Sequence, residues 1–274
     1  MNEITIKVLG SVAPYCKKDK NCPGFLIEYK NNKYLFDCGN GLTRQLNFPN
    51  DLENLKIFIT HLHHDHIGDI SAIANAALVY QRLGYLNNKI DIYLPNMHTI
   101  KQYVHINGEI INYWWYDIVN YEPSVEFKYL KGLEKTCPIN IIENDFFNYQ
   151  NDDLEIIAQI VNHPITTYAY RMNTDIGSIV YSADTGTKNN LEEFAYKSDL
   201  FICESTFLKG QIRKENNHLY AHEAAAIAKL ANVKKLLLTH FWPELDKELY
   251  VKEAKAIFEN TEAAYEGKVL KIRK

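Results

Sequence analysis

The sequence predicts an α/β protein in which helices lie outside packed β-sheets. Short runs rich in β-branched and aromatic residues come early in the chain, at 4–10, 24–29, 33–37, 55–60 and 91–95. A second set lies at 154–162, 168–172, 177–182, 199–203, 234–239 and 268–272, interleaved with segments of helical apolar spacing at 221–231 and 246–259. Because strands and helices recur in two similar halves, we expect two sheets covered by helices.

Local signals place the first hairpin and the first helix. Asn31-Asn32 separates two strand-forming runs and predicts a tight turn between them. Ser71 precedes apolar residues at helical spacing over 71–86, so it is the expected N-cap of that helix.

The chain has no internal repeat, low-complexity tract or linker-like stretch, which predicts a single domain over residues 1–274. The segment of about 99–150 has the weakest periodicity and is rich in aromatic residues. Those aromatic residues fit a core, a lid or an oligomer contact.

Composition argues for a cytoplasmic protein that does not grip long nucleic acids. The formal net charge is −4, so a large polyanion is not the expected partner. The five cysteines are scattered without a CxxC pair, which is typical of a reducing compartment. Neither a signal-peptide pattern nor an apolar stretch long enough to span a bilayer is present, and no membrane partner is expected.

The stretch "THLHHDHIGD" concentrates four of the ten histidines directly after a strand-forming run. Such a cluster could be a metal site, a pH-sensitive patch or an accident of composition. His61, His63, Asp65 and His66 follow the spacing HxHxDH, and imidazole nitrogens and carboxylate oxygens are ligands that zinc accepts.

Distant residues complete the pattern. His163, Asp184 and His240 each terminate an apolar run, where a strand end would place them. Two adjacent ions need roughly seven protein ligands, and the cluster with these three residues supplies that number. The sequence therefore predicts a site for two divalent ions, zinc first and manganese as the alternative.

This set of motifs resembles the metallo-β-lactamase superfamily over nearly the whole chain. The resemblance implies an αββα sandwich of two packed mixed sheets flanked by helices. It also implies that His61, His63 and His163 hold one ion and that Asp65, His66 and His240 hold the other. Asp184 would bridge the two ions.

The resemblance also implies supporting residues near the ions. Asp37, in "FDCGNG", matches the early family aspartate that supports the site from behind, and Asp69 would orient a ligand. His64 is expected to be structural.

Other motifs point to one branch of the superfamily. "LFDCGNGLTRQL", "HPITTYAYR", "CESTF" and "HLYAHEAAAIAKLANVKKLLLTHF" resemble the transfer-RNA 3′-processing endonucleases and their phosphodiesterase relatives. In that branch Glu204 and His218 would act as a catalytic pair, together with Asp65. Cys203 stands where the family has a histidine.

Two further residues have open assignments. Arg171 fits equally a phosphate-binding residue or a structural one that pairs with a carboxylate. His222, four residues after His218, is expected to be solvated or to support a neighbour.

The substrate expectation rests on a short connection. Only 20 residues separate His163 from Asp184, too few for the long arm with which the transfer-RNA enzymes grip their substrate. A small phosphodiester is therefore the expected substrate, with RNA processing and non-catalytic nucleotide binding as the alternatives.

Among small-substrate relatives, the chain most resembles the anti-Pycsar phosphodiesterases. These are homodimers that degrade cyclic mononucleotides used in antiphage signalling. The resemblance implies a homodimer acting on 3′,5′-cyclic CMP, UMP, AMP and GMP. Aromatic residues that could stack on the base are Tyr113, Trp114, Trp115 and Tyr116.

Overall fold

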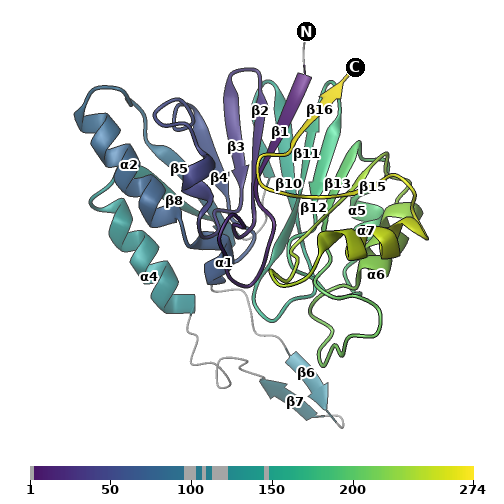
Figure 1. Cartoon of the computed structure of the whole chain (residues 1–274). Coiled ribbons are helices and arrows are strands. Elements are labelled where there is room, and N and C mark those ends of the chain that lie inside the picture. The colour runs from purple at the N-terminus through teal and green to yellow at the C-terminus, as the bar shows by residue number, and fades with distance from the viewer. Residues whose placement is uncertain (1–2, 96–102, 107–108, 113–122, 145–147) are drawn as a thin grey trace.

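Two seven-stranded mixed sheets face each other, with helices on the outer face of each, in a computed structural model of the chain (Figure 1). The structure describes residues 3–95, 103–106, 109–112, 123–144 and 148–274. This architecture confirms the expected sandwich of two packed sheets flanked by helices.

The first sheet combines the N-terminal half of the chain with its last strand. Its strands, in spatial order, are β16 (Val269–Arg273), β1 (Glu3–Gly10), β2 (Gly24–Tyr29), β3 (Asn32–Phe36), β4 (Leu55–Phe58), β5 (Ile90–Pro95) and β8 (Ile139–Asn144). Pairing is antiparallel from β16 to β3 and parallel from β3 to β8.

The second sheet repeats this pattern. Its strands, in spatial order, are β15 (Thr261–Ala263), β14 (Leu236–Thr239), β13 (Leu200–Glu204), β12 (Ser178–Tyr181), β11 (Tyr168–Thr174), β10 (Leu154–Ile160) and β9 (Asn148–Gln150). Pairing is antiparallel from β9 to β12 and parallel from β12 to β15. The two halves are thus alike, except that β16 leaves the second half to pair with β1.

Helices cover both outer faces. On the first side lie α2 (Ile70–Arg82) and α4 (Pro123–Glu134), and on the second lie α5 (Leu191–Phe194), α6 (Ala221–Leu230) and α7 (Lys247–Lys255) (Figure 1). The short elements η1 (Leu42–Gln45) and α1 (His64–Ile67) lie in connections of the first half. The strands β6 (Tyr103–Ile106) and β7 (Glu109–Asn112) form a separate two-stranded sheet.

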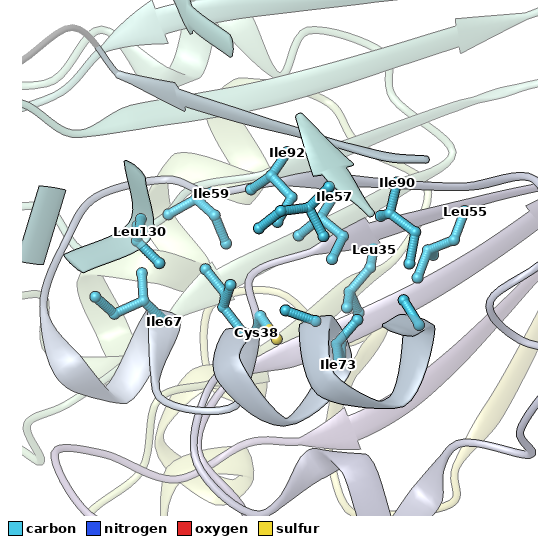
Figure 2. Close-up of a cluster of buried hydrophobic side chains, with 14 of the residues drawn as sticks. Leu35, Cys38, Leu55, Ile57, Ile59, Ile67, Ile73, Ile90, Ile92 and Leu130 are labelled. Carbon is cyan, nitrogen blue, oxygen red and sulfur yellow. The ribbon is translucent and has the colours of Figure 1, made fainter. Parts of the chain in front are cut away.

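Alternating apolar residues divide the core into three layers. In β4, Ile57 faces the layer under α2 and α4, whereas Phe58 faces the layer between the sheets. Figure 2 shows the first of these layers, with Ile57 and Ile92 from the sheet and Ile73 from α2. The third layer lies between the second sheet and α6 and α7. Both faces are buried along central strands such as β13 and β14, in which every residue is buried, whereas edge strands such as β16 bury neither face completely.

The first hairpin turns one residue earlier than expected. Tyr29 pairs with Asn32, so Lys30 and Asn31 form the two-residue loop rather than Asn31-Asn32. Both loop residues have positive φ, 44° and 63°, as a type I′ turn requires. Asn31 adopts this conformation readily, and the register of the strands imposes it on Lys30.

The prediction that Ser71 is the N-cap of the helix expected over 71–86 is wrong. Helix α2 begins at Ile70, and Asp69 occupies the N-cap position without a side-chain capping bond. The helix ends at Arg82, because Gly84, with φ of 78°, follows in a left-handed conformation.

The weakly patterned segment 99–150 contributes regular structure. Strand β8 pairs in parallel with β5 along its full length, and the β8 residues Ile139 and Ile141 are buried. Leu130 of α4 joins the same layer. Part of this segment is therefore core, although the residues that show it are aliphatic and do not decide between the three expectations for the aromatic residues.

Ile73 offers a test of the layer under α2. Its side chain is fully buried, so Ile73→Ala should lower the free energy of unfolding by about 2–5 kcal/mol through lost burial and a cavity. Val79, on the same helix, is 53% exposed, and Val79→Ala should change stability by less than about 0.5 kcal/mol. Urea denaturation followed by circular dichroism measures both, and equal losses would contradict this packing.

Candidate metal centre

The seven predicted ligands all follow the carboxyl end of a strand. His61, His63, Asp65 and His66 follow β4, His163 follows β10, Asp184 follows β12, and His240 follows β14. Helix α1 carries Asp65 and His66, both of which are buried. The structure thus brings to one place residues that are up to 179 positions apart in sequence.

Three residues other than glycine have a left-handed backbone conformation in the turns that form this site. Asp37, Ala183 and His240 have φ values of 59°, 56° and 63° and follow β3, β12 and β14. Such conformations cost on the order of 1–3 kcal/mol each and persist only where surrounding contacts hold them. These three strained residues lie in the turns that orient the side chains of the site.

The first group of ligand atoms contains three histidines and Asp184. His63 Nδ1 lies 2.9 Å from His61 Nε2 and 3.3 Å from His163 Nε2. His61 Nε2 lies 3.8 Å from Asp184 Oδ2. These four side chains present one ligand atom each within a sphere small enough for one ion.

The second group contains Asp65, His66 and His240. Asp65 Oδ2 lies 3.5 Å from His66 Nε2 and 3.6 Å from His240 Nε2. Asp184 reaches this group as well, because its Oδ1 lies 3.4 Å from His66 Nε2 and its Oδ2 lies 3.0 Å from His240 Nε2. The Asp184 carboxylate therefore borders both groups.

Both groups fit a divalent ion. Zinc bonds of about 2.0–2.1 Å in a tetrahedron separate neighbouring ligand atoms by about 3.3–3.4 Å. The measured separations, from 2.9 to 3.8 Å, scatter around that value. In the described part of the chain, the buried His66 Nε2, His240 Nε2 and Asp184 Oδ1 atoms have no hydrogen-bond partner.

Four of the histidines are held by their other ring nitrogen. The Nδ1 atoms of His61, His66, His163 and His240 contact Thr60 Oγ1 (3.0 Å), Asp37 Oδ2 (2.6 Å), Asn217 O (3.2 Å) and Thr206 Oγ1 (2.8 Å). A ring that donates from Nδ1 keeps a lone pair on Nε2, the nitrogen that faces the groups. His63 is the exception, since it faces the first group with Nδ1.

The buried Asp37 carboxylate lies behind the two groups and is linked to residues of both. Its Oδ2 accepts from His66 Nδ1 (2.6 Å), Thr60 Oγ1 (3.0 Å) and the Tyr181 hydroxyl (2.8 Å). Its Oδ1 accepts from the Thr60 backbone N–H (2.8 Å). One fully buried carboxylate thus orients ligands of both groups, His66 directly and His61 through Thr60.

Burial and charge give the two groups different protonation. Burial, reinforced by neighbouring imidazoles, holds the pKa of His61 and of His163 well below the usual value, and burial lowers the pKa of His63 to about 4. These three rings are neutral, as metal ligation requires.

The second group is charged instead. Burial opposes the charged forms, but Asp184 outweighs it and raises the pKa of His66 well above the usual value and the pKa of His240 to about 10. Burial likewise opposes ionisation of Asp184, yet His240 and His66 hold the pKa of that carboxyl well below its usual value. Within the described residues no lysine or arginine pairs with Asp65 or Asp184, so their charge needs protons or metal ions as counterions.

A histidine–glutamate pair lies beside the two groups. His218 Nδ1 lies 2.9 Å from Glu204 Oε1 and 4.0 Å from Asp184 Oδ2. Glu204 is fully buried and also accepts from the Thr185 and Thr206 backbone N–H groups, at 3.0 and 3.1 Å. Although Asp184, His218 and His240 form a third set of suitable ligands, the Glu204 contact occupies the His218 Nδ1 atom.

The loop that carries His218 is fastened to both neighbouring loops. Asn162 Nδ2 donates to Asn216 O (2.9 Å), and the Gly186 N–H donates to Asn162 O (2.8 Å). A Cβ atom at Gly186 would lie 1.9 Å from Asn216 O, so only glycine permits this approach. The carbonyl of Asn217 that holds His163 belongs to the same loop.

Other sequence predictions have different surroundings from those expected. The Asp69 carboxylate accepts from the backbone N–H groups of Gly41 (3.0 Å) and Thr43 (2.8 Å), so it holds the start of η1 rather than a histidine. The Arg171 guanidinium donates to the carbonyls of Phe194 (2.7 Å) and Tyr196 (3.1 Å), which ties β11 to the end of α5.

The remaining candidates are placed as follows. His64 is exposed, and His222 pairs with Glu253 of α7 at 2.7 Å. Cys203 is buried in the layer under α6. Tyr113, Trp114, Trp115 and Tyr116 lie outside the described residues.

Two threonines that the sequence reasoning did not select are central to the site. Thr60 directly precedes His61, and Thr206 follows Glu204 by two residues in "CESTF". Each hydroxyl joins a buried carboxylate to a ligand histidine. The sequence signal that could have identified these threonines is their position one or two residues from a motif residue.

Replacement of Asp184 tests the shared carboxylate. Purified protein loaded with zinc should hold two ions per chain, and Asp184→Asn should lose at least one, because an amide binds zinc weakly on both sides. Zinc is measured by atomic emission after gel filtration. His64→Ala removes an exposed neighbour of the ligands and should keep both ions. Two ions in Asp184→Asn would contradict the shared arrangement.

Comparison with known proteins places the chain in a family. The model of the beta-lactamase superfamily domain matches residues 32–241. Ribonuclease Z from Clostridium acetobutylicum is 27% identical over 325 residues, which cover 97% of this chain and 97% of the relative. Because the chain has only 274 residues, that alignment includes insertions in the relative.

A second relative aligns with this chain over almost the full length of both proteins. The probable metallo-hydrolase YhfI from Bacillus subtilis is 26% identical over 254 residues, covering 92% of this chain and 93% of the relative. Its crystal structure has a TM-score of 0.79 at 23% identity and covers 98% of this chain and 99% of its own.

A crystal structure of a diphosphatase of the PhnP family has a TM-score of 0.69 at 17% identity and covers 100% of both chains.

No helix in the described ranges is both long and apolar enough to cross a bilayer. The match over residues 32–241, the two-sheet fold and the paired histidine and aspartate groups show that the chain belongs to the metallo-β-lactamase superfamily of metal-dependent hydrolases.

Proposed function

We propose that this chain is a two-metal phosphodiesterase that opens 3′,5′-cyclic mononucleotides to linear nucleoside monophosphates. The observation that carries the proposal is the His218–Glu204 pair, held 2.9 Å apart beside two groups of metal-ligating side chains. Hydrolysis of a phosphodiester needs a nucleophile, neutralisation of charge and protonation of the leaving oxygen.

We propose that His61, His63 and His163 would hold one ion, that Asp65, His66 and His240 would hold the other, and that Asp184 would serve both. Two such ions, zinc first and manganese as the alternative, would supply Lewis acidity toward the phosphoryl oxygens and would lower the pKa of water. Burial and fixed Nδ1 contacts hold the ligand atoms ready for them.

His218 is the proposed proton donor. In the reaction a water oxygen bonds to phosphorus and loses a proton to solvent, the bond from phosphorus to one ribose oxygen breaks, and His218 gives that ribose oxygen a proton. The Nδ1 contact to Glu204 fixes the ring, which leaves Nε2 as the nitrogen that exchanges a proton with the substrate. Asp65, a buried carboxylate of the second group, is assigned to the catalytic residues together with His218 and Glu204.

The short connection between β11 and β12 supports a small substrate. Between His163 and Asp184 the chain forms only these two strands and a turn at 175–177, so this stretch contains no arm. The alignment with YhfI needs almost no insertion, whereas the alignment with the clostridial ribonuclease Z does. A cyclic mononucleotide fits a site without a surface for a long polyanion.

Two further expectations belong to this proposal. All five cysteines have free thiols, which supports a reducing cytoplasm. A homodimer that removes cyclic-nucleotide signals in antiphage defence follows from the resemblance to the anti-Pycsar phosphodiesterases, and sedimentation tests the dimer.

RNA cleavage is the second candidate, because ribonuclease Z relatives align over nearly the whole chain. Incubation of the zinc-loaded protein with cyclic CMP, UMP, AMP and GMP, and separately with a precursor transfer RNA, separates the candidates. Linear monophosphates with intact RNA are expected. A trimmed 3′ trailer with all four cyclic nucleotides unchanged would overturn the proposal.

Replacement of His218 tests the catalytic pair. His218→Ala should lower kcat by about 10²–10⁴-fold, the usual value of a general acid, while both zinc ions are retained. His222→Ala is the matched control, because His222 pairs with Glu253 instead and should keep kcat within a few-fold. An unchanged kcat in His218→Ala would contradict the assignment.

A further inference from the structure

We propose that the Thr206 hydroxyl is a positioning group that couples the His218–Glu204 pair to the second metal group. Thr206 Oγ1 lies 2.9 Å from Glu204 Oε2 and 2.8 Å from His240 Nδ1. The other oxygen of the same carboxylate, Oε1, contacts His218 Nδ1 at 2.9 Å. One buried glutamate therefore contacts the proposed proton donor with one oxygen and, through Thr206, a ligand of the second ion with the other.

The direction of the hydrogen bonds follows from counting protons. A carboxylate oxygen only accepts, so the single proton of the Thr206 hydroxyl is donated to Glu204. The hydroxyl oxygen then accepts from His240, which places a proton on His240 Nδ1. The lone pair of His240 is thereby assigned to Nε2, the atom 3.6 Å from Asp65 Oδ2 and facing the second group.

The same arrangement occurs once more in the site. Thr60 Oγ1 donates to Asp37 Oδ2 at 3.0 Å and lies 3.0 Å from His61 Nδ1. A carboxylate, a threonine hydroxyl and a ligand histidine thus form a chain behind each metal group. The two chains differ in what else the carboxylate contacts, because Asp37 also contacts His66 and the Tyr181 hydroxyl, whereas Glu204 contacts His218.

The surroundings of Thr206 hold its backbone independently of the hydroxyl. Its N–H donates to Glu204 Oε2 (3.1 Å), and its carbonyl accepts from the Tyr250 hydroxyl of α7 (3.2 Å). The preceding N–H, of Ser205, donates to Thr239 O (2.9 Å). Removal of the hydroxyl alone should therefore leave the loop in place and free the His240 ring to rotate.

Three substitutions isolate the hydroxyl. Thr206→Val replaces it with a methyl group of similar size, and Thr206→Ser retains it. Thr239→Val is the matched control, because the Thr239 hydroxyl is also buried but has no hydrogen-bond partner in the described part of the chain. Circular dichroism of each zinc-loaded variant verifies the fold.

The first measurement is zinc retention, which needs no substrate. During titration with a chelator, Thr206→Val should release one of its two ions at about 10- to 100-fold lower chelator activity than the wild type. Thr206→Ser and Thr239→Val should follow the wild type. Unchanged retention in Thr206→Val, or equal loss in Thr206→Ser, would overturn the positioning role.

The second measurement tests the coupling and rests on the proposed function. At saturating zinc, Thr206→Val should lower kcat more than it raises KM, and this loss should shrink in a His218→Ala background. If Thr206→Val lowers kcat by the same factor in the wild type and in the His218→Ala background, the coupling is overturned. If the wild type hydrolyses no cyclic nucleotide, the proposed function fails, and zinc retention still decides the role of Thr206.

Discussion

The site depends on a carboxylate that is buried between two groups of imidazoles. Asp184 is almost completely enclosed, and its oxygens lie 3.0–4.0 Å from ring nitrogens of His61, His66, His218 and His240. A buried charge is costly unless it is matched, so this position requires positive charge on both sides. Protons on His66 and His240 match it when no ion is bound, and the two proposed divalent ions would match it on both sides.

The fold meets this requirement by joining its two sheets at the site. The Tyr170 hydroxyl donates to Ile59 O (2.8 Å), and the Tyr168 N–H donates to Thr60 O (2.9 Å). The Tyr181 hydroxyl reaches Asp37 across the same boundary. Strands of the second sheet therefore hold the chain that leads into the histidine cluster of the first. Distance and orientation between the two groups are set by the packing of the sheets.

Residues whose chemistry is local were predictable from the sequence. The convergence of the candidate ligands follows from histidine and aspartate at the ends of apolar runs, because strand ends expose side chains and metal ions select those residue types. The two-sheet fold follows from the repeated order of strands and helices.

Residues whose role depends on their tertiary neighbours were not predictable in this way. Thr60 and Thr206 are ordinary strand or loop residues until a carboxylate and an imidazole lie on either side. Arg171 and Asp69 were assigned by residue type, but Arg171 donates to carbonyls near α5, and Asp69 accepts from backbone N–H groups at the start of η1. The Ser71 cap failed because Asp69 occupies the N-cap position, while its carboxylate binds the start of η1. Strand β8 was missed in the weakly periodic segment 99–150 because its pairing with β5 is a long-range contact that local patterns do not reveal.

The substrate is selected by what surrounds the site rather than by the ligands, because the superfamily's fold does not choose the reaction. The proposed selection has two parts: a proton donor held by Glu204, and a short β11–β12 connection that offers no arm. Both parts presuppose that two ions lie on either side of Asp184.

A crystal structure of the zinc-loaded protein with anomalous scattering at the zinc edge tests that premise most directly. Two peaks about 3.5–4 Å apart are expected. One should be bound by His61, His63 and His163, the other by Asp65, His66 and His240, and both by Asp184. A single peak, or two peaks of which only one contacts Asp184, would contradict the account.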